Sequence, residues 1–249
     1  MPIIKIGDPA SEPESKHKKN KRSFEKIDPK EMDQKKLKEK LENGKINYLH
    51  TDKKKIIIVT ARVHPGETVS SYIVEGLIRF LVFANKKSNI VETSKFDHNG
   101  KPYSPNAIRT AKFLRKKFVF MIIPMVNPDG VVAGHYKSSF AGHDLNKIFL
   151  IPNKKLHPVI YHIQNLVASS KDKIFSYIDL QGHVKKKCTF IYGPEFPLHN
   201  QNYFKIRALP KILDTLSEDF RFHSCMFHVN KHNERTARVV LYRKFDITY

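Results

Sequence analysis

Two short apolar runs most constrain the fold of this 249-residue chain. Residues 56–60 read Ile-Ile-Ile-Val-Thr, and residues 118–124 read Phe-Val-Phe-Met-Ile-Ile-Pro. Continuous runs of β-branched and aromatic residues are typical of strands that are buried on both faces, as in sheets covered by helices. Residues 70–84 follow the first run with apolar side chains at helical spacing. The pattern predicts strands that alternate with helices.

The remainder of the chain extends this alternation. We expect further helices at residues 157–168 and 201–220 and further strands at 175–180, 189–192 and 238–242, with a polar segment over residues 85–115 that turns at Asn99-Gly100. The predicted fold class is therefore α/β, with a mixed, largely parallel central sheet flanked by helices.

Residues 1–54 differ in composition from residues 55–249. They are rich in lysine and poor in apolar side chains, so burial cannot offset the entropy cost of ordering them. We expect a basic, poorly ordered N-terminal arm with one short helix over residues 28–44, begun by Asp-Pro and ended by Gly. The arm is either a nuclear-localisation or nucleic-acid patch or, as charge blocks usually are, a solvated tail. Residues 55–249 form one domain.

Charge and composition restrict the partners. The formal net charge of +21 predicts an acidic partner, which is a nucleic acid, an anionic membrane surface or an acidic protein. Nucleic acid is the weakest option, because the aromatic residues fall in apolar runs and do not interleave with basic ones. No apolar run reaches the roughly 18–20 residues that cross a bilayer, and no secretory signal opens the chain. Two cysteines, Cys188 and Cys225, suit a reducing compartment. We expect no membrane association.

The residues that follow the predicted strands carry the chemistry. His64 and Glu67, in His-Pro-Gly-Glu, come directly after the first strand and can face one centre. Zinc accepts both imidazole nitrogen and carboxylate oxygen, and catalytic zinc usually takes three protein ligands. His183 is the natural third candidate, since it follows the strand at 175–180 and sites form beyond the carboxyl ends of such strands. Taken alone, each histidine in a chain with 13 of them is better explained as a satisfied polar residue than as a ligand.

These residues lie in sequence blocks that resemble those of the metallocarboxypeptidases, and most closely those of the cytosolic carboxypeptidase subgroup. In the family's order, the blocks are Ala-Arg-Val-His-Pro-Gly-Glu (61–67), Ile-Pro-Met-Val-Asn-Pro-Asp-Gly-Val (123–131), Gly-His-Asp-Leu-Asn-Lys (142–147), Asp-Leu-Gln-Gly-His (179–183) with Lys-Lys (185–186) and Phe-Ile-Tyr-Gly (190–193), and Thr-Ala-Arg-Val-Val (236–240). The resemblance runs from about Lys55 to Tyr249. It implies a zinc peptide hydrolase that removes C-terminal residues, with one Zn²⁺ held by His64, Glu67 and His183.

The resemblance also implies how substrate is bound. Asn146 and Lys147 would bind the terminal carboxylate, and Lys137 would stabilise the oxyanion. Both lysines stand where the family usually has Arg, whose planar fork grips a carboxylate in two places, so weaker carboxylate binding is expected. They otherwise belong to the general lysine excess. Gln181 stands where the subgroup often has His, and Asp129 is either a site-shaping residue or part of a turn.

One expected residue is missing from the pattern. In this family a glutamate on a strand soon after the block at 236–240 acts as the general base, and residues 244–249 resemble the segment just before it. The resemblance therefore implies a domain cut short of its base, with activity in doubt, because loss of a general base costs about 10²–10⁴ in rate. Glu195 and Glu234 are the remaining candidates, and Glu234 is expected to be structural.

Two functions remain open. The resemblance implies that the substrates are glutamates of acidic C-terminal protein tails such as that of tubulin, which the positive charge suits. The protein would then be a cytoplasmic monomer, with an association with the cytoskeleton left open. The alternative is a zinc-binding pseudo-carboxypeptidase, or an incomplete gene product, that binds acidic tails without cleaving them.

Overall fold

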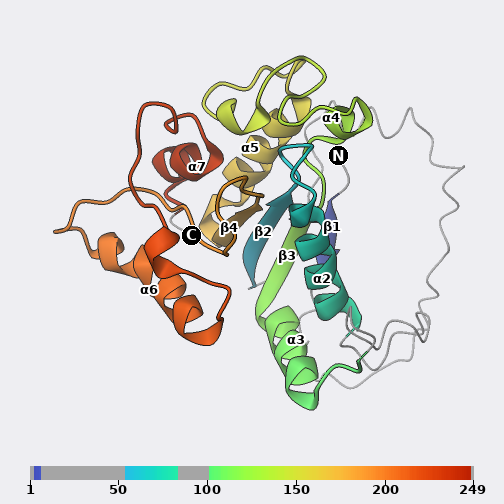
Figure 1. The fold of residues 1–249 in the computed structure, drawn as a ribbon, viewed down its shortest axis with the longest axis vertical. Helices are drawn as coiled ribbons and strands as arrows, with labels where there is room; N and C mark the ends of the chain where they lie inside the picture. The colour runs from blue at the N-terminus through green and yellow to red at the C-terminus, as the bar shows by residue number, and fades with distance from the viewer. Residues whose placement is uncertain (1–2, 7–53, 84–100, 248–249) are drawn as a thin grey trace, which may run out of the picture. The chain divides into compact units, whose positions relative to one another are not determined.

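The computed structural model describes residues 3–6, 54–83 and 101–247 (Figure 1). The predicted helix over residues 28–44, the turn at Asn99-Gly100 and most of the predicted N-terminal arm lie outside the described residues. None of the described helices is both long enough and apolar enough to cross a membrane.

The core of the described structure is a four-stranded sheet in the order β1-β3-β2-β4. The strands are β1 (Ile4–Ile6), β2 (Lys55–Ala61), β3 (Phe118–Ile123) and β4 (Ile174–Leu180). β2 pairs in parallel with both β3 and β4, and β1 pairs antiparallel with β3. The predicted mixed, largely parallel sheet is confirmed. β1 was not predicted, because a three-residue strand shows no periodicity of its own and is defined by pairing with Phe120–Ile122.

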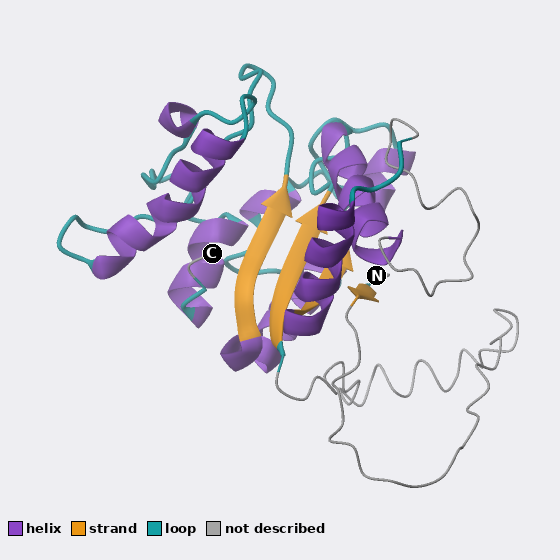
Figure 2. Ribbon diagram, turned by 90° about the horizontal axis from the view of Figure 1, so that it is seen from below, coloured by secondary structure: helices purple, strands orange, loops and turns teal. Residues whose placement is uncertain are grey.

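Helices cover the sheet. Those of the described residues are α2 (Val69–Phe83), α3 (Pro105–Lys117), α4 (Pro128–Val132), α5 (Pro158–Ser170), α6 (Gln201–Leu216) and α7 (Ala237–Phe245), with 3₁₀ turns η2 (Leu145–Lys147), η3 (Lys171–Lys173) and η4 (Phe222–Ser224). One core cluster joins Val74 and Leu81 of α2 to alternate residues of β2 and β3, including Val59 and Ile122. The intervening residues, such as Ile58, are also fully buried, because α5 lies behind the sheet in the view of Figure 1. Figure 2 shows the strands enclosed between helices.

Three sequence expectations were wrong. Residues 238–242 form part of α7 and not a strand; Val239, Val240 and Leu241 are all buried, and a short apolar run has no periodicity that separates a buried helix from a strand. Residues 189–192 make only two isolated bridges, Thr189 to Phe220 and Tyr192 to Met226.

The third wrong expectation concerns residues 85–115, which were expected to form a polar segment without a helix. The structure has α3 there. Its start signal was present in the sequence, since Ser104 caps the helix by accepting the Ala107 N–H at 3.2 Å and Pro105 occupies its first turn. Its buried Arg115 donates to the Leu81 carbonyl of α2 at 2.6 Å. α3 was not predicted because its many Arg and Lys residues leave little apolar periodicity. It packs on α2 partly through the hydrogen bond of Arg115.

Candidate functional site

His64 and Glu67 lie in the turn between β2 and α2, beyond the carboxyl end of β2. Both side chains are buried, with exposed fractions of 5% and 7%. His64 Nδ1 lies 2.9 Å from Glu67 Oε1. A buried imidazole and a buried carboxylate that face each other at a strand end form the first half of the predicted zinc site.

Asp144 is a site residue that the sequence analysis did not identify. Its Oδ1 lies 3.2 Å from His64 Nε2 and also accepts the Asn146 N–H at 3.0 Å. Burial opposes the charged form of His64, but the hydrogen bonds and charges of Asp144 and Glu67 outweigh it and raise the pKa of His64 to about 9. The same contact holds the pKa of Asp144 below its usual range although burial opposes this. Because a ligating histidine must be neutral, a metal bound at His64 would have to displace its proton.

The segment that follows β4 reaches the same place through Gly182. Its N–H donates to Glu67 Oε2 at 2.8 Å. A Cβ atom on Gly182 would lie 3.0 Å from Glu67 Cβ and 3.2 Å from Val69 Cγ1, so glycine permits the close approach. One residue earlier, the Gln181 amide donates to Asp179 Oδ2 at 2.5 Å. The Glu67 carboxylate is therefore bonded both to His64, which follows β2, and to Gly182, which follows β4.

His183 itself does not join His64 and Glu67. Its side chain is exposed, and its Nδ1 accepts the N–H groups of Lys185 at 3.2 Å and Lys186 at 3.0 Å. Its ring packs edge-on against Phe190, with centroids 5.3 Å apart. Within the described ranges, no three His, Cys, Asp or Glu side chains form a metal-binding group. The structure therefore brings together two of the three predicted ligands and the chain neighbour of the third.

The donor set nevertheless suits zinc. Zinc takes imidazole nitrogen and carboxylate oxygen, and its histidine ligands usually bond through the other ring nitrogen to a carboxylate. His64 has the carboxylate half of this arrangement, since Asp144 contacts Nε2, while Nδ1 faces the carboxylate of the other predicted ligand, Glu67. His183 Nδ1 carries no proton, and its lone pair would be available to a metal once the N–H groups of Lys185 and Lys186 release it.

Asn127 connects the strand ends around this turn. Its buried amide caps α4 by accepting the Gly130 N–H at 3.0 Å and donates at 3.3 Å to the carbonyls of Val63 and Ser138. The block Asn-Pro-Asp-Gly at residues 127–130 therefore shapes the turn through its Asn, while Asp129 lies in the first turn of α4.

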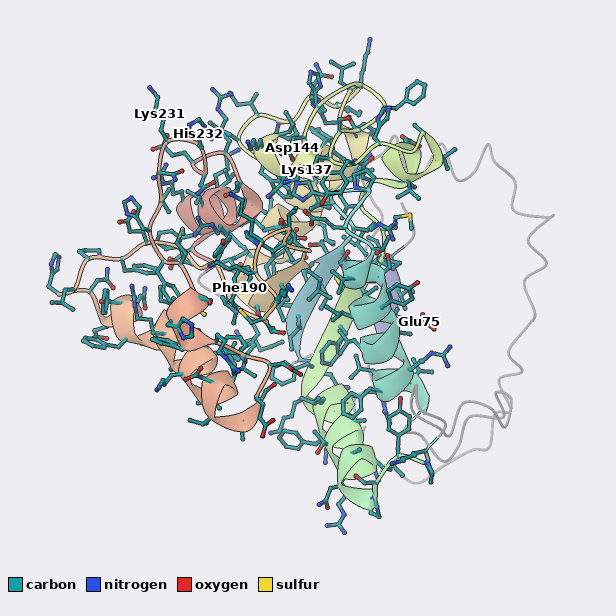
Figure 3. The ribbon with its side chains drawn as sticks, viewed as in Figure 1. Glu75, Lys137, Asp144, Phe190, Lys231 and His232 are labelled. Carbon is teal, nitrogen blue, oxygen red and sulfur yellow. The ribbon has the colours of Figure 1, made fainter. Side chains whose placement is uncertain are left out.

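The predicted substrate residues lie around the same strand ends. Asn146 and Lys147 are in η2, directly after Asp144, and Lys147 lines a cavity of about 390 Å³. The other residues of this cavity wall are Gly142, His143, Asp144, Ile148, Lys231, His232 and Arg235. Lys137 is exposed and precedes Ser138, which forms a bridge with Asp144. Figure 3 shows Lys137 beside Asp144, and Lys231 with His232, at the same end of the molecule.

The two glutamates considered as general bases are engaged elsewhere. Glu195 contacts His228 Nδ1 at 2.8 Å and accepts the Val229 N–H at 2.9 Å, and the bond to His228 holds the pKa of Glu195 below its usual range. Glu234 lies 4.0 Å from Arg243. A carboxylate with a lowered pKa is a weaker base, so the structure favours a structural role for Glu195. The contact with Arg243 favours the same role for Glu234.

Known proteins resemble the chain in sequence and in fold. The model of the zinc carboxypeptidase family matches residues 29–173, a range that includes His64, Glu67 and Lys147 and ends before His183. The chain is 35% identical over 209 residues to cytosolic carboxypeptidase 4 of Homo sapiens and 37% identical over 206 residues to cytosolic carboxypeptidase 1 of Mus musculus. These matches cover 77% of this chain but only 16% and 15% of those proteins.

Solved structures agree on the fold. The metallo-carboxypeptidase from Burkholderia cenocepacia superposes with a TM-score of 0.63 at 22% identity, over 80% of this chain and 48% of that one. A putative carboxypeptidase A from Shewanella denitrificans gives 0.61 at 25% identity, again over 80% and 48%. The described strands and helices therefore correspond to part of a larger known fold.

Proposed function

Because the chain belongs to the zinc carboxypeptidase family, we propose that it is a zinc-dependent metallocarboxypeptidase that removes C-terminal residues, and specifically glutamates from acidic protein tails such as that of tubulin. The observation that carries the proposal is the buried pair of His64 and Glu67 at the end of β2, bonded to Asp144 on one side and to Gly182 on the other. The names of the cytosolic relatives support a cytoplasmic location.

His64, Glu67 and His183 would hold one Zn²⁺. The ion supplies Lewis-acid polarisation of a carbonyl group and of water. Asp144 orients the His64 ring and Gly182 orients the Glu67 carboxylate, so both side chains are held before metal arrives. His183 would join them only if its Nδ1 exchanged the N–H groups of Lys185 and Lys186 for the ion.

The basic residues around the cavity would bind the substrate. Lys147 offers a cation to the terminal carboxylate, and Asn146 lies next to it in η2. Lys137, beside the bridge between Ser138 and Asp144, would stabilise negative charge on the scissile carbonyl oxygen. Lys231 and Arg235 add two positive charges to the same cavity. One terminal carboxylate can pair with Lys147 alone, so these further charges support a substrate that carries additional carboxylates.

A second candidate function is tail binding without cleavage. It is favoured by one observation, that His64 Nδ1 is bonded to Glu67 while His183 is turned into its own loop. The cavity residues could bind an acidic tail in either case. Such binding would survive removal of metal and weaken steeply as salt is added.

The test uses the full 249-residue chain and a peptide that ends in consecutive glutamates. One bound zinc per chain with release of glutamate supports the enzyme, and tail binding that survives chelation without any release supports the second candidate. His64→Ala and Glu67→Ala are expected to abolish zinc binding, whereas Glu75→Ala, on the exposed face of α2 in an ion pair with Arg79 (Figure 3), retains it. A chain that binds neither zinc nor the peptide refutes both functions.

A further inference from the structure

The cavity beside Lys147 contains an imidazole whose proton is positioned by a buried neighbour. His143 lines the cavity, together with Lys231 and Arg235. Its Nδ1 lies 2.8 Å from Nε2 of His157, and the two rings are 4.9 Å apart at an angle of 57°. His143 is exposed, whereas His157 is 6% exposed and stands at the start of α5.

The hydrogen bonds around His157 settle which nitrogen carries each proton. The backbone N–H of Asn153 donates to His157 Nδ1 at 3.2 Å. Because a backbone N–H can only donate, His157 Nδ1 has no proton and the neutral ring carries its proton on Nε2. That proton points to His143 Nδ1, which must accept it. A neutral His143 therefore carries its own proton on Nε2, at the ring edge away from His157.

Burial keeps the His157 ring neutral. Removal from water, and then the nearby His143, lower the pKa of His157, so its ring stays uncharged at neutral pH. The α5 backbone also fixes the position of His157, whose N–H donates to the Asn153 carbonyl at 2.7 Å and whose carbonyl accepts the Tyr161 N–H at 3.0 Å. His143 thus accepts a fixed hydrogen bond from His157 at Nδ1, and its own N–H, on Nε2, is on the opposite side of the ring.

We propose that His143 is a specificity-determining residue whose Nε2–H donates to a side-chain carboxylate of the substrate in this cavity, with His157 as the positioning residue that selects the tautomer. Lys231 and Arg235 neutralise the same carboxylate, which leaves Lys147 for the terminal one. The cations supply attraction at any angle, whereas the directed N–H selects the position of an oxygen atom. Asp144, in the same cavity wall, repels a second carboxylate, so these donors are needed.

This inference rests on the proposed function. Its test is made without metal, so that the role of His143 and the zinc-dependent cleavage can be refuted independently of each other. The full chain is freed of zinc with a chelator and titrated with two fluorescent tripeptides that differ only in ending with glutamate or glutamine. The ratio of their dissociation constants measures recognition of the side-chain charge. Cleavage plays no part, so loss of zinc-dependent hydrolysis would not alter this ratio.

Wild type is expected to bind the glutamate peptide more tightly. His143→Ala should lower the ratio about tenfold, the usual order for a hydrogen bond to a charged group, and Lys231→Met combined with Arg235→Met should lower it further. His199→Ala, an exposed histidine that is not among the cavity residues, serves as the matched control and should leave it unchanged. A ratio that His143→Ala leaves intact overturns the proposal.

The tautomer is tested independently of any variant. The ¹⁵N shifts of the imidazole rings in the wild-type chain should show His143 protonated on Nε2 and bare on Nδ1. In His157→Phe, both tautomers of His143 should become populated and the glutamate preference should fall. A wild-type His143 that carries its proton on Nδ1 refutes the positioning role, even where the His157 variant fails to fold.

Discussion

Asn127 is the residue whose loss should most disturb the strand ends that carry the site. Its side chain makes three hydrogen bonds, one to Gly130 in α4 and two to the carbonyls of Val63 and Ser138. Val63 precedes the first predicted zinc ligand, and Asn127 is itself only 2% exposed. Asn127→Ala removes all three bonds and leaves their partners at Gly130 and Val63 buried, and the carbonyl of Ser138 partly buried.

The expected cost follows from those partners. Loss of the helix cap costs about 0.5–2 kcal/mol. Each buried group left without a partner costs about 1–3 kcal/mol, and the two carbonyls have a second lone pair that reduces the penalty toward the lower end. The sum is about 3–4 kcal/mol, which is a large part of the roughly 5–15 kcal/mol by which domains are stable.

Equilibrium unfolding in urea measures this cost, with Asn200→Ala as the matched control. Asn200 caps α6 by accepting the Asn202 N–H at 2.8 Å, so its loss removes a cap alone and should cost about 1 kcal/mol. Asn127→Asp keeps the acceptor for Gly130 but loses both donors, and should approach the alanine variant. If Asn127→Ala costs no more than Asn200→Ala, then the amide does not connect the strand ends as argued.

Three further predictions concern the site. Asp144→Ala removes the carboxylate that orients His64 and should weaken zinc binding about 10–100-fold, as measured by competition with a chelator; unchanged affinity would show that the contact does not orient the ligand. Gly182→Ala places a Cβ 3.0 Å from the neighbouring glutamate and should lower zinc affinity in the same assay, whereas Gly76→Ala, whose Cβ would meet nothing, should keep it and stabilise its helix by about 1 kcal/mol. Lys147→Arg should lower KM for peptide substrates, because a guanidinium grips a carboxylate in two places; an unchanged KM would argue against a carboxylate role at this position.

The sequence predicted the buried strands correctly but not every helix. The runs at 56–60 and 118–124 are strands because their side chains are buried on both faces, and that is visible in a linear pattern. The turn that holds His64 and Glu67 follows from its place after the first run. α7 was misread because Val239, Val240 and Leu241 are buried all round, which removes the periodicity that marks a helix.

The sequence by itself determined the buried strands of the sheet, the helix that follows the first of them and the residue types of the predicted zinc site, because strand burial and a His-x-x-Glu spacing are properties of neighbouring residues. Only the tertiary structure decided which distant groups meet. Asp144 contacts a histidine 80 residues earlier, and His143 receives its tautomer from His157 through a bond that no spacing encodes. Such contacts depend on where β2 ends and where η2 and α5 begin relative to one another. Strand register and helix packing set those positions, and they arise only when the chain has folded.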